Sequence, residues 1–469
     1  MWEFVPTGIE GLDKILMGGI PHPSTVLIEG PIGSGKSVLG MQLIYTGITK
    51  QNRPGMILAL DKFPKMLFKD AENFSWNFKD LEKENKFQFI SAFPDDLIQP
   101  FSHTVCRAEE LIDNSIAKIN AQILLIDSFS HLWRISNNID ELKQICEKII
   151  AFLKAKNLTS FIIISRDEYP VQGTFFEEYF ADVIIKLHNY PSKDSLSGEN
   201  IRSIEIAKSR GQNCISGKHR IKLSKNGISI FPHSFIELNE TRDWEISKTK
   251  ISTGLPELDK LLDGGLLEGS TTLITGIPGS GKTTFCVQLV KNFLDTNKKS
   301  LIASFDPGKK IESDLTFLGI NIEKAQQSNS LHIIKQNPIN LNLDEFIYEL
   351  EKIIKEQKPQ LVIIDSLTDF ESSIENTIKL RNYLHLIIHL FEKNNVIGLL
   401  TCETRFNEPI RSLSDIDHSY LVDGVIHLSL SEEDKKLSHE ISVLKMRGVS
   451  CNAERRKCII DNNELKIYI

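Results

Sequence analysis

The sequence has few cysteines, and their spacing does not suggest a metal site or a disulfide framework. Its 469 residues include 7 cysteines, scattered along the chain with no C-x-x-C pair. Paired cysteines at short spacing are typical of zinc sites, and cysteine-dense frameworks are typical of small secreted domains. We therefore expect reduced thiols in a cytoplasmic protein.

Long hydrophobic runs are also missing from the sequence. No stretch approaches the roughly 18 apolar residues that a membrane helix needs. The first residues, MWEFVPTGIE, include a glutamate and no apolar segment of signal-peptide length. We expect no association with a membrane.

The chain has no excess of positive charge. It contains 55 Lys and Arg against 62 Asp and Glu, which gives a formal net charge of −7. A strongly basic surface is the usual signature of nucleic-acid binding, so a nucleic acid is not an expected partner. The hydrophobic fraction of 41% and the charged fraction of 25% are those of globular domains with a buried core.

One long internal repeat organises the chain. Residues 7–19 read TGIEGLDKILMGG, and residues 253–265 read TGLPELDKLLDGG. Later landmarks recur in the same order at slightly shorter offsets, as duplication followed by changes in loop length would produce. We therefore predict two domains, residues 1–243 and 244–469, joined in the polar stretch 238–248.

Short apolar runs alternate with amphipathic segments in both halves. Continuous apolar runs of this length are typical of strands that are buried on both faces of a parallel sheet. Alternation of strands and helices predicts an α/β fold, with a largely parallel, twisted sheet flanked by helices in each domain. The predicted strands are Val26–Glu29, Met56–Leu60, Ile123–Ile126 and Phe161–Ile164, then Thr272–Thr275, Leu301–Ser304, Leu361–Ile364 and Val396–Leu400, and helical spacing is clear in Asp140–Lys154 and Ile374–Lys393.

Each half contains a glycine-rich phosphate-binding pattern. Residues 30–37 are GPIGSGKS and residues 276–283 are GIPGSGKT, and both match G-x-x-x-x-G-K-[ST] between a predicted strand and a helical pattern. Glycines let several backbone N–H groups point at one phosphate, and the helix N-terminus adds partial positive charge. The alternative is a glycine-rich turn without a ligand. The predicted ATP-binding residues are Gly30, Gly33, Ser34, Gly35, Lys36 and Ser37 in the first half, and Gly276, Gly279, Ser280, Gly281, Lys282, Thr283 and Thr284 in the second.

A magnesium site is predicted beside each loop. Asp127 ends the run QILLID, and Asp365 ends LVIID. An aspartate at the carboxyl end of a buried strand lies where α/β proteins bind ligands. We assign Asp127 with Ser37, and Asp365 with Thr283, as Mg²⁺ ligands. The alternative is that each aspartate caps a helix.

These motifs together resemble the KaiC family, a group of RecA-like ATPases that includes the circadian clock protein. The resemblance rests on the opening TG-x-x-x-LD-x-x-x-x-GG, the loop GPIGSGKS, the strand ends IDSFS and IDSLT, and the later segments KSRG and KMRG. It covers nearly all of both halves. It implies two tandem RecA-like P-loop domains, and a homo-oligomeric ring, typically a hexamer, that holds ATP between neighbouring subunits.

The resemblance also implies a role for the K-x-R-G segments. In the family this segment contacts the triphosphate bound by the adjacent subunit. Carried over, it assigns this role to Lys208 and Arg210 in the first half and to Lys445 and Arg447 in the second. A cation supplied in trans can stabilise charge on the γ-phosphate. The alternative is a solvated basic turn.

The chain departs from the family at the end of the second predicted strand. Family members usually carry two adjacent glutamates there, one of which activates the attacking water. This sequence has Asp61 with Lys62 in the first half and Asp306 with Pro307 in the second. We take Asp61 and Asp306 as candidate catalytic bases and expect slow hydrolysis, because a shorter carboxylate is displaced from the nucleophile. The alternative is that both are solvated strand-end carboxylates.

A second departure concerns self-phosphorylation. The clock protein phosphorylates an adjacent Ser–Thr pair near the end of its second domain. Here Ser419 is followed by Tyr420, and Ser414 resembles a second element of that region. Serines are also common in loops that are never phosphorylated.

Three functions remain open from the sequence. The first is a KaiC-like, slow Mg²⁺-dependent ATPase that assembles into a ring, with serine autokinase activity as an addition. The second is a non-catalytic ATP-sensing scaffold. The third, a RecA-like DNA recombinase or helicase, is disfavoured by the acidic net charge.

Overall fold

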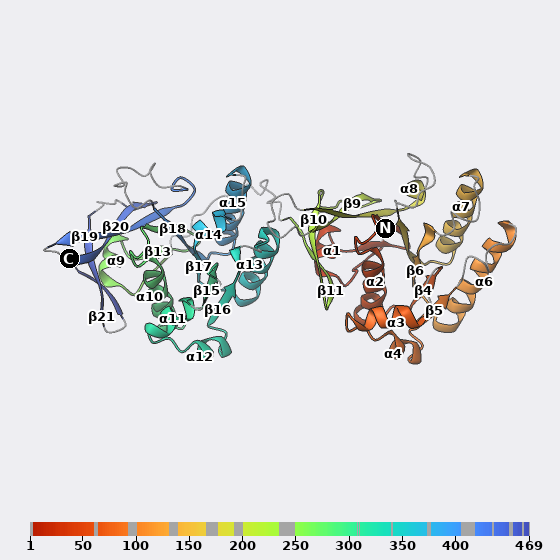
Figure 1. Ribbon diagram of the computed structural model, residues 1–469, viewed down its shortest axis with the longest axis horizontal. Coiled ribbons are helices and arrows are strands. Elements are labelled where there is room, and N and C mark those ends of the chain that lie inside the picture. Colours follow the sequence, from red (N-terminus) through yellow and green to blue (C-terminus); the bar gives the residue numbers. More distant parts are fainter. Residues whose placement is uncertain are drawn as a thin grey trace. The chain divides into compact units, whose positions relative to one another are not determined.

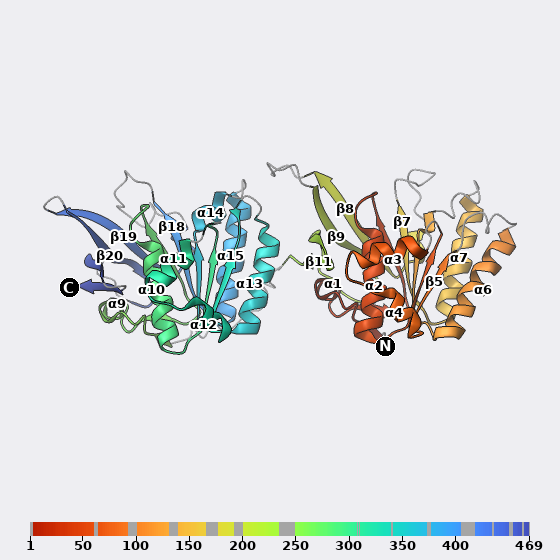
Figure 2. The ribbon, with the colours of Figure 1, turned by 60° about the horizontal axis from the view of Figure 1, so that its bottom comes forward.

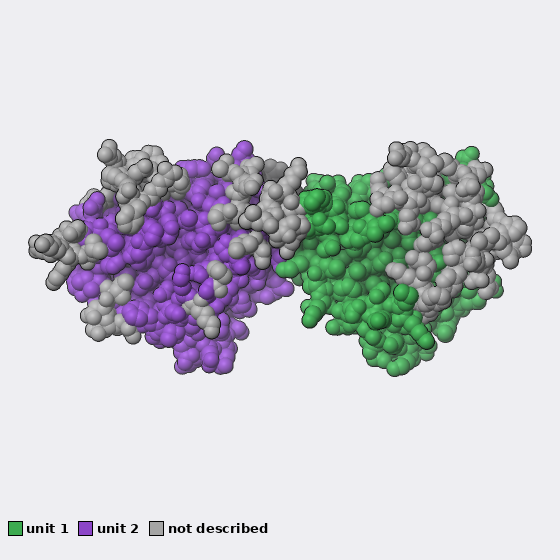
Figure 3. All heavy atoms as spheres, in the orientation of Figure 1, with its two compact units in different colours: residues 1–235 green, residues 236–469 purple. Residues whose placement is uncertain are grey.

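The chain divides into two compact units, Met1–Phe235 and Ile236–Ile469 (Figure 3). The predicted boundary at residues 243 and 244 and the polar join around it lie outside the described residues. The computed structural model describes residues 3–60, 64–91, 101–130, 139–165, 177–191, 200–233, 249–306, 308, 310–338, 341–372, 377–404, 418–433, 436–449, 454–461 and 464–468.

The first unit contains one large sheet and a two-stranded ribbon. The ribbon pairs β1 (Glu3–Val5) with β2 (Ile20–His22). The strands of the large sheet are β3 (Thr25–Gly30), β4 (Gly55–Ala59), β5 (Phe87–Ser91), β6 (Ile123–Asp127), β7 (Thr159–Ser165), β8 (Val183–Pro191), β9 (Asn200–Ser209), β10 (His219–Ser224) and β11 (Gly227–Phe231). The helices are α1 (Glu10–Ile15), α2 (Lys36–Gln51), α3 (Pro64–Glu72), α4 (Phe78–Lys83), α6 (Phe101–Ile119), α7 (Ile139–Ala155) and α8 (Glu177–Phe180).

The second unit repeats this inventory. Its ribbon pairs β12 (Lys250–Ile251) with β13 (Leu266–Leu267). The strands of its large sheet are β14 (Thr271–Gly276), β15 (Ser300–Ser304), β16 (Leu331–Lys335), β17 (Leu361–Asp365), β18 (Ile397–Glu403), β19 (Gly424–Glu433), β20 (Lys436–Met446), β21 (Arg456–Asp461) and β22 (Glu464–Tyr468). The helices are α9 (Pro256–Leu261), α10 (Lys282–Asp295), α11 (Lys310–Phe317), α12 (Ile322–Gln327), α13 (Leu343–Gln357), α14 (Leu367–Ser372) and α15 (Thr377–Lys393).

The two large sheets have the same topology. The first is ordered β5-β4-β6-β7-β3-β8-β9-β10-β11, and the second is ordered β16-β15-β17-β18-β14-β19-β20-β21-β22. The parallel part of the sheet runs from β5 to β8 in the first unit and from β16 to β19 in the second. The remaining strands, β9–β11 and β20–β22, extend each sheet with antiparallel pairing. The largely parallel α/β fold predicted from the sequence is therefore confirmed, and the duplication extends to the strand order.

Each sheet is covered by helices on both faces, as Figures 1 and 2 show. In β6, Ile123 and Leu125 pack into one hydrophobic cluster, while Leu124 and Ile126 pack into a second one on the other face. Side chains on both faces are buried, so the strand is apolar at each position from Ile123 to Ile126 rather than at alternate ones. The predicted strands of both halves all lie within observed strands or overlap them closely.

The repeated opening motif has a structural role in both units. The carboxylate of Asp13 accepts a hydrogen bond from the backbone N–H of Thr7 at 2.5 Å, and that of Asp259 accepts one from Thr253 at 2.8 Å. These bonds hold the turn before α1 and α9, beside the helix that follows each phosphate loop.

None of the helices in the described ranges combines the length and the apolar composition that a membrane span requires.

Candidate functional site: two phosphate loops and the strand ends around them

Both glycine-rich patterns form a loop between a buried strand and a helix. The first connects β3 to α2, which begins at Lys36, and the second connects β14 to α10, which begins at Lys282. Gly35 and Gly281 have φ angles of 101° and 91°, values that a residue with a side chain rarely adopts. This geometry lets the loop turn sharply into the helix N-terminus, where backbone N–H groups are available to a phosphate.

The lysine of each loop is buried beneath it. Nζ of Lys36 donates hydrogen bonds to the carbonyl oxygens of Gly30 and Pro31, both at 2.8 Å. Nζ of Lys282 makes the equivalent bonds to Gly276 at 3.0 Å and Ile277 at 3.1 Å. Burial lowers the pKa of Lys282 from its ordinary value. Each ammonium group is thus held at the turn where a triphosphate would lie.

Polar groups in both loops are placed to meet a ligand. The side-chain hydroxyls of Ser34 and Ser280 are buried and have no hydrogen-bond partner in the described part of the chain. Buried hydroxyls normally have a partner, so these two are available to one supplied from outside. The remaining predicted contacts, Ser37, Thr283 and Thr284, follow in the first helical turns and are partly exposed.

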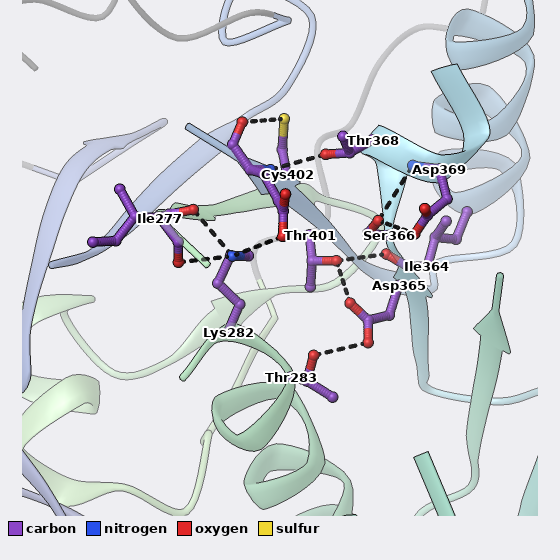
Figure 4. A network of polar contacts seen from close by, with 12 residues as sticks. Ile277, Lys282, Thr283, Ile364, Asp365, Ser366, Thr368, Asp369, Thr401 and Cys402 are labelled. Carbon is purple, nitrogen blue, oxygen red and sulfur yellow. Dashed lines mark hydrogen bonds and ion pairs between the residues drawn. The ribbon is translucent and has the colours of Figure 1, made fainter. Parts of the chain in front are cut away.

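In the second unit, the two predicted magnesium ligands contact each other. The hydroxyl of Thr283 donates to Oδ2 of Asp365 at 2.9 Å, and the hydroxyl of Thr401 donates to Oδ1 of the same carboxylate at 2.5 Å (Figure 4). In the first unit, Asp127 likewise ends its strand and is buried, and Ser37 begins α2 as Thr283 begins α10. The strand order brings both aspartates to the loop edge of their sheets.

These residues suit a Mg²⁺ ion that is also bound by nucleotide phosphates and water, rather than a metal ion bound by protein side chains alone. Mg²⁺ binds oxygen ligands, and nucleotide enzymes supply one or two carboxylates or hydroxyls while phosphates and water complete the shell. The hydroxyl and carboxylate of Thr283 and Asp365 are such a pair. Within the described ranges, no group of three or more His, Cys, Asp or Glu side chains could hold a metal ion by itself.

The candidate catalytic base of the second unit is held by a cation. Oδ2 of Asp306 lies 2.9 Å from Nζ of Lys310, and Oδ1 accepts from the backbone N–H of Gly308 at 2.8 Å. The bond from Lys310, followed by the bond from Gly308, lowers the pKa of Asp306 and so makes it a weaker base. Asp61, its counterpart in the first half, lies outside the described residues, as does Lys62.

The K-x-R-G residues lie at the opposite end of each sheet from the phosphate loop of the same unit. Nη1 of Arg210 contacts Asp182 at 3.3 Å, and the same carboxylate accepts from the backbone N–H of Thr25, the first residue of β3. The loop begins at Gly30, the last residue of that strand. At about 3.3 Å per residue, roughly 17 Å separates the two ends.

The second unit repeats this arrangement. Nη1 of Arg447 contacts Asp423 at 3.0 Å, and Asp423 accepts from the backbone N–H of Thr271 at 3.0 Å. In both units a β-bulge directly precedes the lysine of the motif. Burial, and then the charge of the nearby arginine, lowers the pKa of Lys208 and of Lys445. In each unit the lysine and the arginine of the motif therefore lie close enough for their charges to interact.

The described serine of the phosphorylation hypothesis lies next to one of these lysines. Ser419 is buried, and its carbonyl oxygen accepts a hydrogen bond from Nζ of Lys445 at 2.9 Å. Tyr420 is exposed, and the Arg381 guanidinium lies over its ring at 5.3 Å. Ser414 lies outside the described residues.

The sequence reasoning missed two polar residues at the end of β18. Thr401 contacts the carboxylate of Asp365, and Oε1 of Glu403 lies 3.9 Å from Nζ of Lys282. The sequence contained the same signal that identified Asp365: an apolar run is followed by polar residues, here Thr401 and Glu403 in TCE and there the aspartate of LVIID. The strand-end rule that identified Asp365 would have identified both residues.

Comparison with known proteins is consistent with this geometry. A family model described as "ATPase: KaiC" matches residues 5–234 and again residues 251–469. The circadian clock oscillator protein KaiC of Prochlorococcus marinus strain MIT 9313 is 26% identical over 467 residues, covering 98% of this chain and 91% of that protein. The protein of the same name from Thermostichus vulcanus is 28% identical over 454 residues, covering 95% of this chain and 85% of its own length.

The family match spans both units, and within each it includes the phosphate loop, the strand-end aspartate and the K-x-R-G segment. The strand order of the two units is the same, so the two matches describe one duplicated architecture. The chain therefore belongs to the KaiC family of ATPases.

Proposed function

We propose that this protein binds one ATP with Mg²⁺ in each unit and hydrolyses it slowly. The observation that carries the proposal is the chain of contacts from Thr283 through Asp365 to Thr401, beside the buried Lys282 (Figure 4). A cation, a hydroxyl and a carboxylate meet at one loop, as phosphoryl transfer requires for positioning and charge stabilisation. ATP and Mg²⁺ are abundant in the cytoplasm, which is the proposed location.

Slow turnover follows from the state of the proposed bases. Asp61 and Asp306 replace longer carboxylates, and Asp306 is engaged by Lys310. General-base action contributes roughly 10²–10⁴-fold to rate, so a weak and displaced aspartate at these two positions lowers the turnover that each site can reach. A non-catalytic ATP-sensing scaffold is the alternative, and it predicts binding without turnover.

We also propose assembly into a homo-oligomeric ring, with a hexamer as the expected size. Arg210 and Arg447 lie at the far end of β3 and β14 from their own phosphate loops. This position supports a role for both arginines at the nucleotide of another copy. ATP that bridges two subunits would favour the assembled state by mass action.

The function is tested by Mg²⁺-dependent phosphate release from the purified protein. Asp365→Asn should lower turnover at the second site by roughly 10²-fold. The substitution removes the negative charge that holds Mg²⁺, and without the ion the charge on the transferring phosphate is less well stabilised. The assay uses a Lys36→Ala chain, so that the second site is observed alone. Asp263→Asn, which changes an exposed carboxylate of the same unit, is the matched control. Equal turnover in Asp365→Asn and its parent would remove Asp365 from the proposed site.

Serine self-phosphorylation is a second candidate activity. The carbonyl oxygen of Ser419 accepts a hydrogen bond from Lys445, a residue proposed to reach a neighbour's phosphates. The serine that would receive a phosphate is therefore adjacent to the residue that would contact the ATP. After incubation with Mg²⁺–ATP, we expect phosphate on Ser419 in a minority of chains, because the residue must first turn out of its buried position. Mass spectrometry of the wild type and Ser419→Ala measures this. Phosphate that persists at the same level in Ser419→Ala would refute the assignment.

A further inference from the structure

Glu403 and Ser165 occupy the same position in the two units. In the sheet register, Glu403 is the partner of Gly276 at the start of the second loop, and Ser165 is the partner of Gly30 at the start of the first. The two positions also share an anchor. The backbone N–H of Glu403 donates to the hydroxyl of Thr368 at 3.0 Å.

The first unit has the same anchor. The backbone N–H of Ser165 donates to the hydroxyl of Ser130 at 2.8 Å, and Ser130 and Thr368 each follow the strand-end aspartate by the same number of residues. The backbone is therefore equivalent, and the difference between the units is the side chain. The second site has a carboxylate where the first has a small hydroxyl group.

The carboxylate of Glu403 faces the phosphate loop. Its Oε1 lies 3.9 Å from Nζ of Lys282, and its side chain is 45% exposed while that of Lys282 is 8% exposed. It is therefore close to the triphosphate position and still accessible to water. By contrast, the carboxylate of Asp306 is bound by Lys310 and by Gly308.

We propose that Glu403 is a catalytic residue of the second site, where it orients the attacking water and accepts its proton. This inference rests on the proposed ATPase function. The water oxygen forms a bond to the γ-phosphorus, and the bond from that phosphorus to the β–γ bridging oxygen breaks. The bridging oxygen leaves with the electron pair as part of ADP, and one water proton passes to the Glu403 carboxylate. The first site has Ser165 at this position and is the slower of the two.

The test measures kcat and ATP affinity in a Lys36→Ala chain, in which the second site acts alone. Glu403→Gln should lower kcat by about 10²-fold, the lower end of general-base effects, with ATP affinity within a few-fold of the parent. The substitution keeps the size of the side chain and leaves the backbone anchor to Thr368 intact, so folding is preserved. Asp306→Asn should lower kcat only several-fold.

The matched control is Ser165→Ala in a Lys282→Ala chain, in which the first site acts alone. A serine hydroxyl does not act as the general base for water, so the loss of the Ser165 hydroxyl should change kcat less than twofold. An equal kcat loss in Ser165→Ala and Glu403→Gln would mean that the position is structural. Tighter ATP binding with unchanged or higher kcat in Glu403→Gln would mean that Glu403 only competes for Lys282.

Either of these two results overturns the inference and leaves the ATPase function standing. A Lys36→Ala chain that binds Mg²⁺–ATP but releases no phosphate overturns the hydrolytic function itself, and the inference with it.

Discussion

Replacing Lys36 and Lys282 together with alanine should weaken ATP binding at both sites by roughly 10- to 100-fold. Each ammonium group is buried at the start of its helix and is held at the turn of the loop. A hydrogen bond to a charged group contributes about 1.5–3 kcal/mol, which corresponds to this change in affinity. Calorimetric titration with a non-hydrolysable ATP analogue and Mg²⁺ measures the effect.

Single variants separate the two sites. Lys36→Ala should leave one tight site per chain, in the second unit, and Lys282→Ala should leave one in the first. Lys83→Ala, at an exposed lysine, is the matched control and should keep both sites. A double variant that binds ATP as tightly as the wild type would show that the loops do not hold the phosphates.

Replacing Arg210 and Arg447 with alanine should lower ATP turnover by roughly 10³-fold and weaken assembly. A cation supplied in trans contributes about 10³–10⁵-fold to phosphoryl transfer. Both arginines lie at the sheet end opposite the phosphate loop of their own unit, so we expect the effect to arise between chains. Light scattering with and without Mg²⁺–ATP measures assembly, and phosphate release measures turnover.

Mixing two inactive chains tests the same idea more sharply. One chain carries Lys36→Ala with Lys282→Ala and keeps its arginines, and the other carries Arg210→Ala with Arg447→Ala and keeps its loops. In a mixed ring some interfaces combine an intact loop with an intact arginine, so turnover should return. A mixture that stays inactive while it assembles, or a wild type that is monomeric in every nucleotide state, would contradict the trans role.

Much of the fold could be predicted from the sequence because its signals are local. The central strands contain continuous apolar runs, as in Ile123–Ile126, since both faces of each sheet are covered. The loops and strand-end aspartates follow from spacing alone. The antiparallel strands β9–β11 and β20–β22 were not predicted, because they lack the continuous apolar runs of the central strands: burial is mixed along β9 and alternates along β22.

The site was predicted less completely, for a physical reason. The sequence indicates that Asp306 ends a strand, but not that Lys310 pairs with it. It also gives no sign that Glu403 lies beside Lys282, since that contact depends on the order of strands in the sheet. Contacts between strand ends are set by topology, and duplication helped because each unit could be compared with the other.

The number of nucleotides bound per chain tests the central claim most directly. Equilibrium dialysis of the wild-type protein with a labelled non-hydrolysable ATP analogue and Mg²⁺ should give close to two per chain, one at each phosphate loop. A number near zero would contradict the account, because neither loop would then hold the triphosphate for which its glycines, buried lysine and magnesium ligands are arranged.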